Sequence, residues 1–137
     1  MRIIGIDYGD VRTGIAVSDL LGITAQGLES IEHKESEKKL LSRIDDIIKE
    51  YDIKKIVIGY PINMNNTKGP RAEKTDKFIE KLINRFKLEV IKIDERLTTV
   101  AAHRTMSELA LGKDKKKKIV DTISAEYILQ MYLDRKD

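Results

Sequence analysis

The amino-acid sequence predicts one α/β domain of three layers, in which helices flank a five-stranded mixed sheet. The chain has 137 residues, about the length of one ordinary domain. Short apolar runs rich in β-branched residues alternate with longer amphipathic segments, in the order β-β-β-α-β-α-β-α-α. That order gives an antiparallel meander followed by parallel crossovers. We therefore expect residues 1–137 to form a single domain.

The first three predicted strands form the meander. Residues 2–8 (RIIGIDY) are a short apolar run that ends in Asp-Tyr-Gly, and residues 14–18 (GIAVS) are a second run after a turn. Together these two runs predict a hairpin. Residues 23–31 (ITAQGLESI) predict a third strand, which Gly27 interrupts.

The middle of the chain predicts two helices that alternate with two strands. In residues 35–51 and again in residues 71–86, apolar side chains recur at the spacing of one helical face. Residues 54–59 (KKIVIG) predict a buried strand, and residues 88–93 (LEVIKI) alternate between polar and apolar, as a strand does. Residues 60–71 contain both prolines, three asparagines and a glycine, which predicts an irregular loop.

The last third of the chain predicts two helices joined by a basic connector. Thr98 or Thr99 can cap a helix that ends near residues 109–111. Residues 113–118 (KDKKKK) then form the connector, and residues 119–133 form the final helix.

Composition excludes several classes of protein. The absence of cysteine excludes a disulfide framework, a thiolate zinc site and a cysteine nucleophile, and it fits a reducing cytoplasm. Aromatic residues make up only 5%, which argues against a base-stacking platform. No segment approaches the roughly 20 apolar residues of a membrane helix, and the start of the chain reaches a charged residue too soon for a signal peptide. We expect a cytoplasmic protein with no membrane partner and a mild net charge of +3.

Three of the 23 acidic residues stand at the edges of apolar elements, whereas most others lie beside lysines on helix faces. Asp7 ends the most apolar predicted strand, where a carboxylate is costly without a cation or hydrogen-bond donors. Glu95 directly follows residues 88–93, at a strand end where parallel α/β sheets place their sites. Asp121 lies in the first turn of the last predicted helix, on a face that continues through Ser124 to apolar residues.

Each of these carboxylates also has a plain local explanation. Asp7 can be a turn-forming residue that accepts hydrogen bonds from the following backbone. Glu95 can form a surface pair with Arg96 or be an ordinary loop residue. Asp121 can be a first-turn acid that the helix dipole stabilises by about 0.3–1 kcal/mol. Taken singly, these explanations compete well with a functional one.

Taken together, the three carboxylates predict a metal site. If they meet in space they repel one another unless a cation of high charge lies between them. The chain has only two histidines, His33 and His103, which lie far apart in sequence and which we expect to be surface or helix residues. Oxygen ligands alone suit a hard ion such as Mg²⁺ or Mn²⁺. Two such ions about 3.5–4 Å apart can activate a water and stabilise the leaving oxygen in phosphodiester hydrolysis.

Four segments, in this order along the chain, resemble those of a known family: GIDYGDVRTGIAVSD (5–19), GYPINMNNTKGPRA (59–72), IDERLTT (93–99) and KKIVDTISAEYILQMYLD (117–134). They are similar to the YqgF/RuvX family of Holliday junction resolvase-like nucleases, which are also described as nucleases that mature the 5′ end of the small-subunit ribosomal RNA precursor. The resemblance covers the chain from end to end. It implies a ribonuclease H-like fold and places the family's acidic site on Asp7, Glu95 and Asp121.

The resemblance also assigns basic and polar positions that would handle phosphates. These positions fall on Arg12, Thr67, Gly69, Arg71 and Arg96. The chain departs from the family at Asn66, where a glycine is usual, and asparagine is the residue best able to replace glycine at positive φ. A second departure is Ser124 in place of alanine, and there is no clear candidate for a fourth carboxylate.

A dense basic run comes just before Asp121. It consists of Lys113, Lys115, Lys116, Lys117 and Lys118. One interpretation is a solvated loop, which is the usual role of such a run. The other is that the run draws a phosphate backbone toward the acidic site, in which case binding weakens steeply with salt.

Three functional hypotheses follow. The first is a metal-dependent endonuclease acting on structured RNA or DNA, either an RNA precursor or a branched DNA junction. The second keeps the fold but makes the protein an RNA-binding factor with little catalysis. The third is an ATP-binding protein, because the Asp7-x-Gly9 turn resembles the first phosphate loop of two-lobed ATPases, but the chain has room for only one lobe. Resolution of a junction predicts a homodimer, whereas processing of one RNA strand is possible for a monomer.

Overall fold

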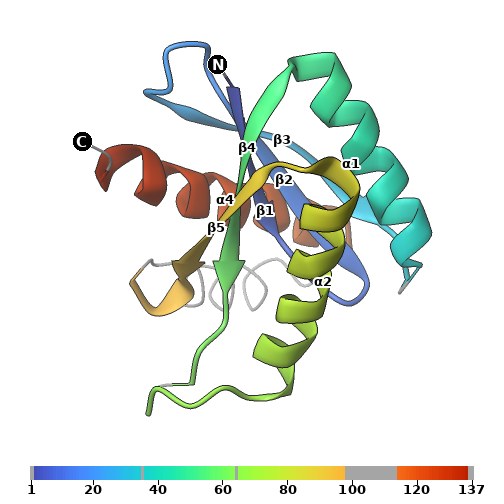
Figure 1. Ribbon diagram of the computed structural model, residues 1–137, viewed down its shortest axis with the longest axis vertical. Helices are drawn as coiled ribbons and strands as arrows, with labels where there is room; N and C mark the ends of the chain where they lie inside the picture. The colour runs from blue at the N-terminus through green and yellow to red at the C-terminus, as the bar shows by residue number, and fades with distance from the viewer. Residues whose placement is uncertain (1, 35, 64, 98–113, 136–137) are drawn as a thin grey trace.

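The fold is a five-stranded mixed sheet with helices on both faces, as Figure 1 shows. The computed structural model describes residues 2–34, 36–63, 65–97 and 114–135. Its elements are β1 (Arg2–Asp7), β2 (Arg12–Ser18), β3 (Ala25–Glu32), α1 (Glu37–Tyr51), β4 (Ile53–Tyr60), α2 (Pro70–Phe86), β5 (Glu89–Asp94), the short 3-10 turn η1 (Glu95–Leu97) and α4 (Asp114–Arg135). The helix predicted to end near residues 109–111 lies outside the described residues.

The sheet confirms the predicted meander and crossovers. Its strand order is β3-β2-β1-β4-β5, in which β1 pairs antiparallel with β2 and parallel with β4. β2 and β3 are antiparallel, and β4 and β5 are parallel. β1 is therefore the central strand, and its carboxyl end lies between neighbours on both sides.

The two faces of the sheet have separate apolar cores. On one face, Ile4 and Ile6 of β1 pack with Leu40 of α1 and Phe78 of α2. On the other face, strand residues pack with Leu129 and its neighbours in α4. The helices α1 and α2 cover the first face. Each turns its apolar side toward the sheet and its polar side toward solvent, which explains the amphipathic pattern of their sequences.

The helix α4 lies very close to the sheet because the strands beneath it have glycines at the points of contact. A Cβ atom on Gly14 of β2 would come within 2.0 Å of the Asp121 carbonyl oxygen. A Cβ on Gly5 of β1 would come within 2.7 Å of Leu129 Cβ. Real Cβ atoms do not approach so closely, so these glycines determine how near α4 can come.

The start of α4 differs from the sequence prediction. The predicted connector at 113–118 is wrong for residues 114–118, because α4 begins at Asp114 and the helix is continuous to Arg135. Lysine has nearly the helix propensity of leucine, and repulsion between like charges costs only a few tenths of a kcal/mol per pair.

Among the described helices, none has the length and apolar character needed to cross a membrane.

The contact between Gly14 and α4 gives the first testable prediction. We expect Gly14→Ala to lower the free energy of unfolding by about 3 kcal/mol, because the added methyl group must push the Asp121 backbone away from β2. Urea unfolding measures this loss. Gln26→Ala, on an exposed position of β3, is the control and should change stability by less than about 0.5 kcal/mol. Equal stability of the two variants would contradict the proposed tight contact.

Candidate functional site

A cavity of about 320 Å³ lies beyond the carboxyl end of β1. It is lined by Asp7, Tyr8, Gly9, Asp10, Val11, Arg12, Arg71, Glu95 and Asp121. The three carboxylates that the sequence singles out therefore line one cavity, although they come from β1, η1 and α4. Two of the expected basic residues, Arg12 and Arg71, line it with them.

Asp7 is the last residue of the central strand and is only 5% exposed. It pairs with Gly14 of β2, and Gly14 pairs in turn with Ser30 of β3. Asp7, Gly14 and Ser30 thus form a row across three strands. Because Gly14 has no side chain, the backbone of α4 at Asp121 can lie directly over the middle of this row.

Asp121 lies two turns inside α4, not in the first turn as the sequence predicted. The helix-dipole explanation for this carboxylate is therefore wrong, because the effect of the dipole falls off within the first turn. The carboxylate is instead held by two donors on the same oxygen. Arg12 Nε donates to Asp121 Oδ2 at 2.9 Å, and Ser30 Oγ donates to the same Oδ2 at 3.0 Å.

Ser30 is a residue of the site that sequence reasoning missed. It lies on β3, 91 positions before Asp121. The signal that could have found it is the pairing of strands, which places Ser30 opposite Gly14 and next to the row that ends at Asp7. That register depends on a bulge between Ile15 and Ala16, which the alternation of residues does not reveal.

Glu95 begins η1 directly after β5. A Cβ on Gly59 of β4 would lie 2.9 Å from Glu95 Oε1, so the Glu95 carboxylate lies over the sheet at the end of β4. The neighbouring Arg96 is hydrogen bonded to the last residue of β5, since its Nη2 donates to Asp94 Oδ2 at 2.8 Å.

Arg96 and Thr67, which the resemblance assigned to phosphates, lie in a network outside the cavity lining. Arg96 Nη1 donates to the Asn63 carbonyl oxygen at 3.1 Å and to Asn66 Oδ1 at 2.8 Å. Its hydrogen bonds also hold the pKa of the Asp94 carboxyl below its usual value. Asn66 has φ of 68°, so it adopts the left-handed conformation expected of a residue that replaces glycine.

Thr67 belongs to the same loop. Its hydroxyl donates to Asn65 Oδ1 at 2.6 Å and accepts from Asn63 Nδ2 at 3.1 Å. Gly69 is the N-cap residue of α2, with extended backbone. In this structure Arg96, Thr67 and Gly69 shape the loop that leads into α2.

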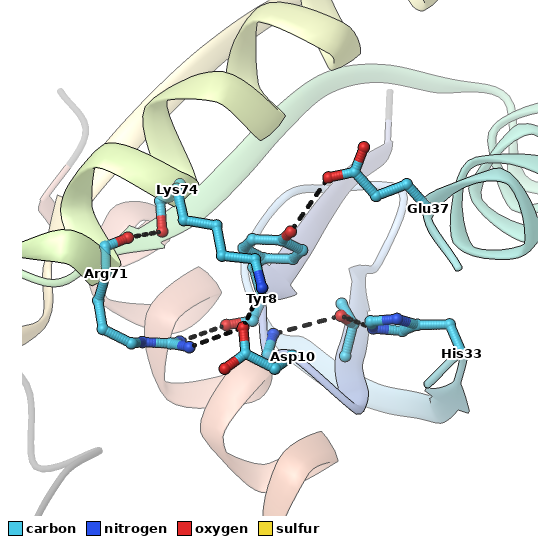
Figure 2. Close-up of polar contacts among 9 residues, drawn as sticks. Tyr8, Asp10, His33, Glu37, Arg71 and Lys74 are labelled. Carbon is cyan, nitrogen blue, oxygen red and sulfur yellow. Dashed lines mark hydrogen bonds and ion pairs between the residues drawn. The ribbon is translucent and has the colours of Figure 1, made fainter. Parts of the chain in front are cut away.

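Arg71 and Lys74, in the first turns of α2, form a basic cluster around Asp10, as Figure 2 shows. Of the two, Arg71 lines the cavity. Arg71 donates to the Tyr8 carbonyl oxygen at 2.9 Å and lies 3.4 Å from Asp10 Oδ1. Lys74 Nζ lies 2.5 Å from the same oxygen. The Lys74 hydrogen bond is the main reason that the pKa of Asp10 is lowered. Sequence reasoning missed Lys74 and Asp10, which are 64 positions apart.

Tyr8 lines the cavity and is held by contacts with two helices. Its ring stacks on Phe78 of α2 with centroids 4.1 Å apart, and its hydroxyl donates to Glu37 Oε1 at 3.4 Å. Burial, followed by the charge of Glu37, raises the pKa of Tyr8 to about 12. Tyr8 is therefore a neutral, packed residue directly after β1, close to Asp10 (Figure 2).

His33 also supports this turn, and its expected place on the surface or on a helix is wrong. The side chain is buried directly after β3. Its Nε2 is hydrogen bonded to Thr13 Oγ1 at 2.9 Å, and Thr13 Oγ1 accepts the Gly9 N–H at 3.3 Å. The His33 N–H donates to the Val11 carbonyl oxygen at 2.9 Å. Figure 2 shows His33 on the opposite side of the turn from Arg71.

The basic run before Asp121 is helical where it is described. The backbone of Lys115, Lys116, Lys117 and Lys118 lies in the first turns of α4. Lys118 Nζ lies 3.6 Å from Glu32 Oε1 at the end of β3. The side chains of the other three lysines, as well as Lys113 and His103, lie outside the described part of the molecule.

The donor set around the cavity has the chemistry that a hard divalent cation requires. Asp7, Glu95 and Asp121 supply carboxylate oxygens, which Mg²⁺ and Mn²⁺ prefer. Over the described ranges, no group of three or more acidic or histidine side chains is already arranged to hold an ion. In the conformation described, Arg12 occupies Asp121 Oδ2. The chemistry of these ligands therefore fits a hard divalent cation. An ion that used Asp121 Oδ2 would lie next to the Arg12 guanidinium.

Comparison with known families and sequences gives one consistent result. The family model described as "RuvX: Holliday junction resolvase" matches residues 1–135. A protein of Ruminiclostridium cellulolyticum named "Putative pre-16S rRNA nuclease" is 62% identical over 135 residues, which cover 98% of this chain and 95% of that protein. A protein of Acetivibrio thermocellus with the same name is 56% identical over 137 residues, covering 99% and 97% of the two chains.

Solved structures show the same fold at low sequence identity. Thermus thermophilus RuvC in complex with a Holliday junction substrate has a TM-score of 0.61 at 14% identity, covering 97% of this chain and 93% of that chain. The Holliday junction resolvase of fowlpox virus has a TM-score of 0.56 at 17% identity, covering 99% and 100%. The mixed sheet with its flanking helices is thus the ribonuclease H-like fold that the resemblance implied.

The buried His33 gives a prediction for pH dependence. Burial lowers the pKa of His33 below its usual value of 6.5, so the unfolded chain binds this proton more readily than the folded one. The stability that neutral His33 contributes is present above pH 6.5 and is lost as the pH falls toward its lower folded pKa. We expect the free energy of unfolding to fall with pH in this window more steeply in the wild type than in His33→Gln. Urea unfolding at a series of pH values measures both slopes.

Nuclear magnetic resonance titration of the His33 ring provides an independent measurement. The His33→Gln variant identifies which of the two histidine signals belongs to His33. A midpoint below 6.5 agrees with the burial of the ring. A midpoint at or above 6.5 would show that burial does not lower the pKa of this ring.

Proposed function

The chain belongs to the RuvX family, whose model matches residues 1–135, and on this premise we propose that the protein is a metal-dependent endonuclease that hydrolyses phosphodiester bonds in structured nucleic acid. One observation carries the proposal. Three carboxylates from separate elements line a single cavity together with Arg12 and Arg71. Acidic groups that can hold cations and basic groups that can hold phosphates are both needed for this reaction.

The acidic residues have the role of metal ligands in this proposal. Asp7, Glu95 and Asp121 would hold Mg²⁺ or Mn²⁺ through their carboxylate oxygens. The bound ions supply the activation of a water and the stabilisation of the leaving oxygen. The burial of Asp7 at the end of the central strand supports this role, because a carboxylate at that position is stabilised by a cation.

The basic residues have the role of positioning the nucleic-acid backbone. Arg12 and Arg71 line the cavity, and Lys74 lies beside Arg71 around Asp10. A guanidinium group can bind two oxygens of one phosphate at once, which fixes its orientation as well as its distance. We assign Arg96 and Thr67 a supporting role, since their hydrogen bonds shape the loop before α2.

The substrate that we propose is the precursor of the small-subunit ribosomal RNA, cleaved near its 5′ end. The names of the relatives at 62% and 56% identity support this choice. A Holliday junction is the alternative, because the description of the family names that substrate. The RNA reaction requires one active site per strand and suits a monomer, whereas symmetric cleavage of a junction requires a homodimer. Processing of ribosomal RNA would place the protein in the cytoplasm.

Asp7→Asn tests the proposed catalytic site. We expect cleavage in the presence of Mg²⁺ or Mn²⁺ to fall at least about a thousandfold, because the amide is a much poorer ligand for a hard cation. Binding of the RNA should stay within about twofold of the wild type, and circular dichroism should show the same fold. The measurement is cleavage of labelled precursor RNA and of a four-way DNA junction, side by side with each metal.

The matched control for this experiment is Asp45→Asn. Asp45 lies on α1 and pairs with Lys49, away from the residues that line the cavity. The Asp45→Asn variant should cleave both substrates at the rate of the wild type. If Asp7→Asn keeps full metal-dependent activity, the proposed site is wrong. Loss of cleavage with growth fully rescued in a depleted cell would instead support an RNA-binding factor whose catalysis is dispensable.

The lysines at the start of α4 give a separate prediction. Replacing Lys115, Lys116, Lys117 and Lys118 together by serine should weaken RNA binding and reduce its dependence on salt. The slope of log K against log salt should decrease by about 0.7 for each phosphate contact that is lost. Fluorescence anisotropy over a range of salt concentrations measures this slope.

The control for the lysine variant replaces four exposed lysines elsewhere with serine. The control positions are Lys38, Lys49, Lys54 and Lys77. Both variants remove four positive charges, so any effect of net charge alone is the same. Equal salt slopes for the two variants would refute a specific role of the α4 lysines in binding.

A further inference from the structure

The contact between Arg12 and Asp121 joins a proposed phosphate-binding residue to a proposed metal ligand. Arg12 Nε lies 2.9 Å from Asp121 Oδ2, and the two side chains are 22% and 11% exposed. Ser30 Oγ donates to the same oxygen at 3.0 Å. A carboxylate oxygen has two lone pairs, and these two donors occupy both of those on Oδ2. The Asp121 oxygen is thus already satisfied by the protein itself.

The contact also places a positive charge where it would repel a bound cation. A guanidinium group beside Asp121 repels a divalent ion held by the same carboxylate, and this repulsion is large for partly buried charges. Ser30 has no net charge and creates no such repulsion. Arg12 is therefore the group that would have to leave Asp121 Oδ2 for an ion to use that oxygen.

The fold does not depend on this contact to hold α4 in place. Ala125, Ile128 and Leu129 of α4 are fully buried against the other face of the sheet. The Gly14 and Gly5 contacts set the distance between helix and strands. Arg12 is at the first position of β2 and is the most exposed member of the pair, so its side chain can move while the strand stays in place.

We propose that Arg12 is a positioning residue that exchanges partners: it neutralises Asp121 when no divalent cation is bound, and cation binding releases its guanidinium to a phosphate of the nucleic acid. This inference rests on the proposed function and deepens it. The exchange links the two halves of the site, because the group that blocks the ion is also a group that can bind the backbone. It keeps the buried carboxylate paired in both states.

The exchange has a consequence that a merely structural salt bridge does not. If Arg12 serves only to hold the folded arrangement of the site, its removal disturbs that arrangement and leaves the binding of metal unchanged or weaker. If Arg12 competes with the ion, its removal makes the binding tighter while cleavage becomes slower. These opposite changes, tighter metal binding and slower cleavage, are the signature of the proposal.

Arg12→Met tests the exchange, because methionine retains the unbranched apolar stem and removes the charge. We expect the Kd for Mn²⁺, measured by isothermal titration calorimetry without nucleic acid, to decrease about tenfold. Mn²⁺ should also raise the Tm of the variant more than that of the wild type. Cleavage of the precursor RNA at saturating Mn²⁺ should decrease, because one phosphate contact is lost.

Two further variants make the test specific. Arg12→Lys keeps the positive charge, so its Kd for Mn²⁺ should stay close to that of the wild type. Arg43→Met removes an arginine paired with Glu29 outside the cavity lining, and its Kd should be unchanged. In the double variant Arg12→Met with Asp121→Asn, the gain in affinity should disappear.

The outcomes separate this inference from the proposed function. An unchanged or weaker Kd in Arg12→Met, with Asp7→Asn inactive, overturns the exchange and leaves the nuclease. If the wild type and Arg12→Met both fail to bind Mn²⁺ at millimolar concentrations, both proposals are wrong. A tenfold gain in Arg12→Met that is lost in the double variant supports the exchange.

Discussion

The close packing of α4 on the sheet at Gly14 is the constraint on which the site depends. Asp121 lies on that helix, and its backbone occupies the space that a side chain on Gly14 would fill. Because Gly14 stands between Asp7 and Ser30 in the strand register, the same contact brings Asp121 to both of them. The end of β1 and the interior of α4 are distant in sequence, and this one approach places both beside the cavity.

The charges around the cavity are balanced in pairs. Asp121 is paired with Arg12, and Asp10 is paired with Arg71 and Lys74. Burying a carboxylate costs several kcal/mol unless a partner accompanies it, so acids in this position bring cations with them. The mild net charge of +3 is therefore an average over a locally dense set of opposite charges. Arg12, Arg71 and Lys74 are therefore each engaged by a carboxylate in the conformation described.

The sequence predicted the parts of the fold that depend on local patterns. The alternation and the apolar runs located every described strand, and the helical faces located α1 and α2, because each pattern reflects which side of one element is buried. It placed Asp7 at the end of the most apolar strand for the same reason, and the structure shows that strand to be the central one. Ser30 and Lys74 were missed because their roles arise from contacts across the sheet and across 64 to 91 positions of chain. No local pattern records such contacts.

The early start of α4 changes the meaning of Asp121. In a helix that began at residue 119, this carboxylate would lie in the first turn and the helix dipole would account for it. In the helix that begins at Asp114, the carboxylate lies inside, largely buried, and beyond the reach of that effect. Its stability must then come from its neighbours, and the neighbours are Arg12 and Ser30. The lysines that extend the helix thus turn a first-turn acid into an interior one, and an interior acid needs the partners that Arg12 and Ser30 supply.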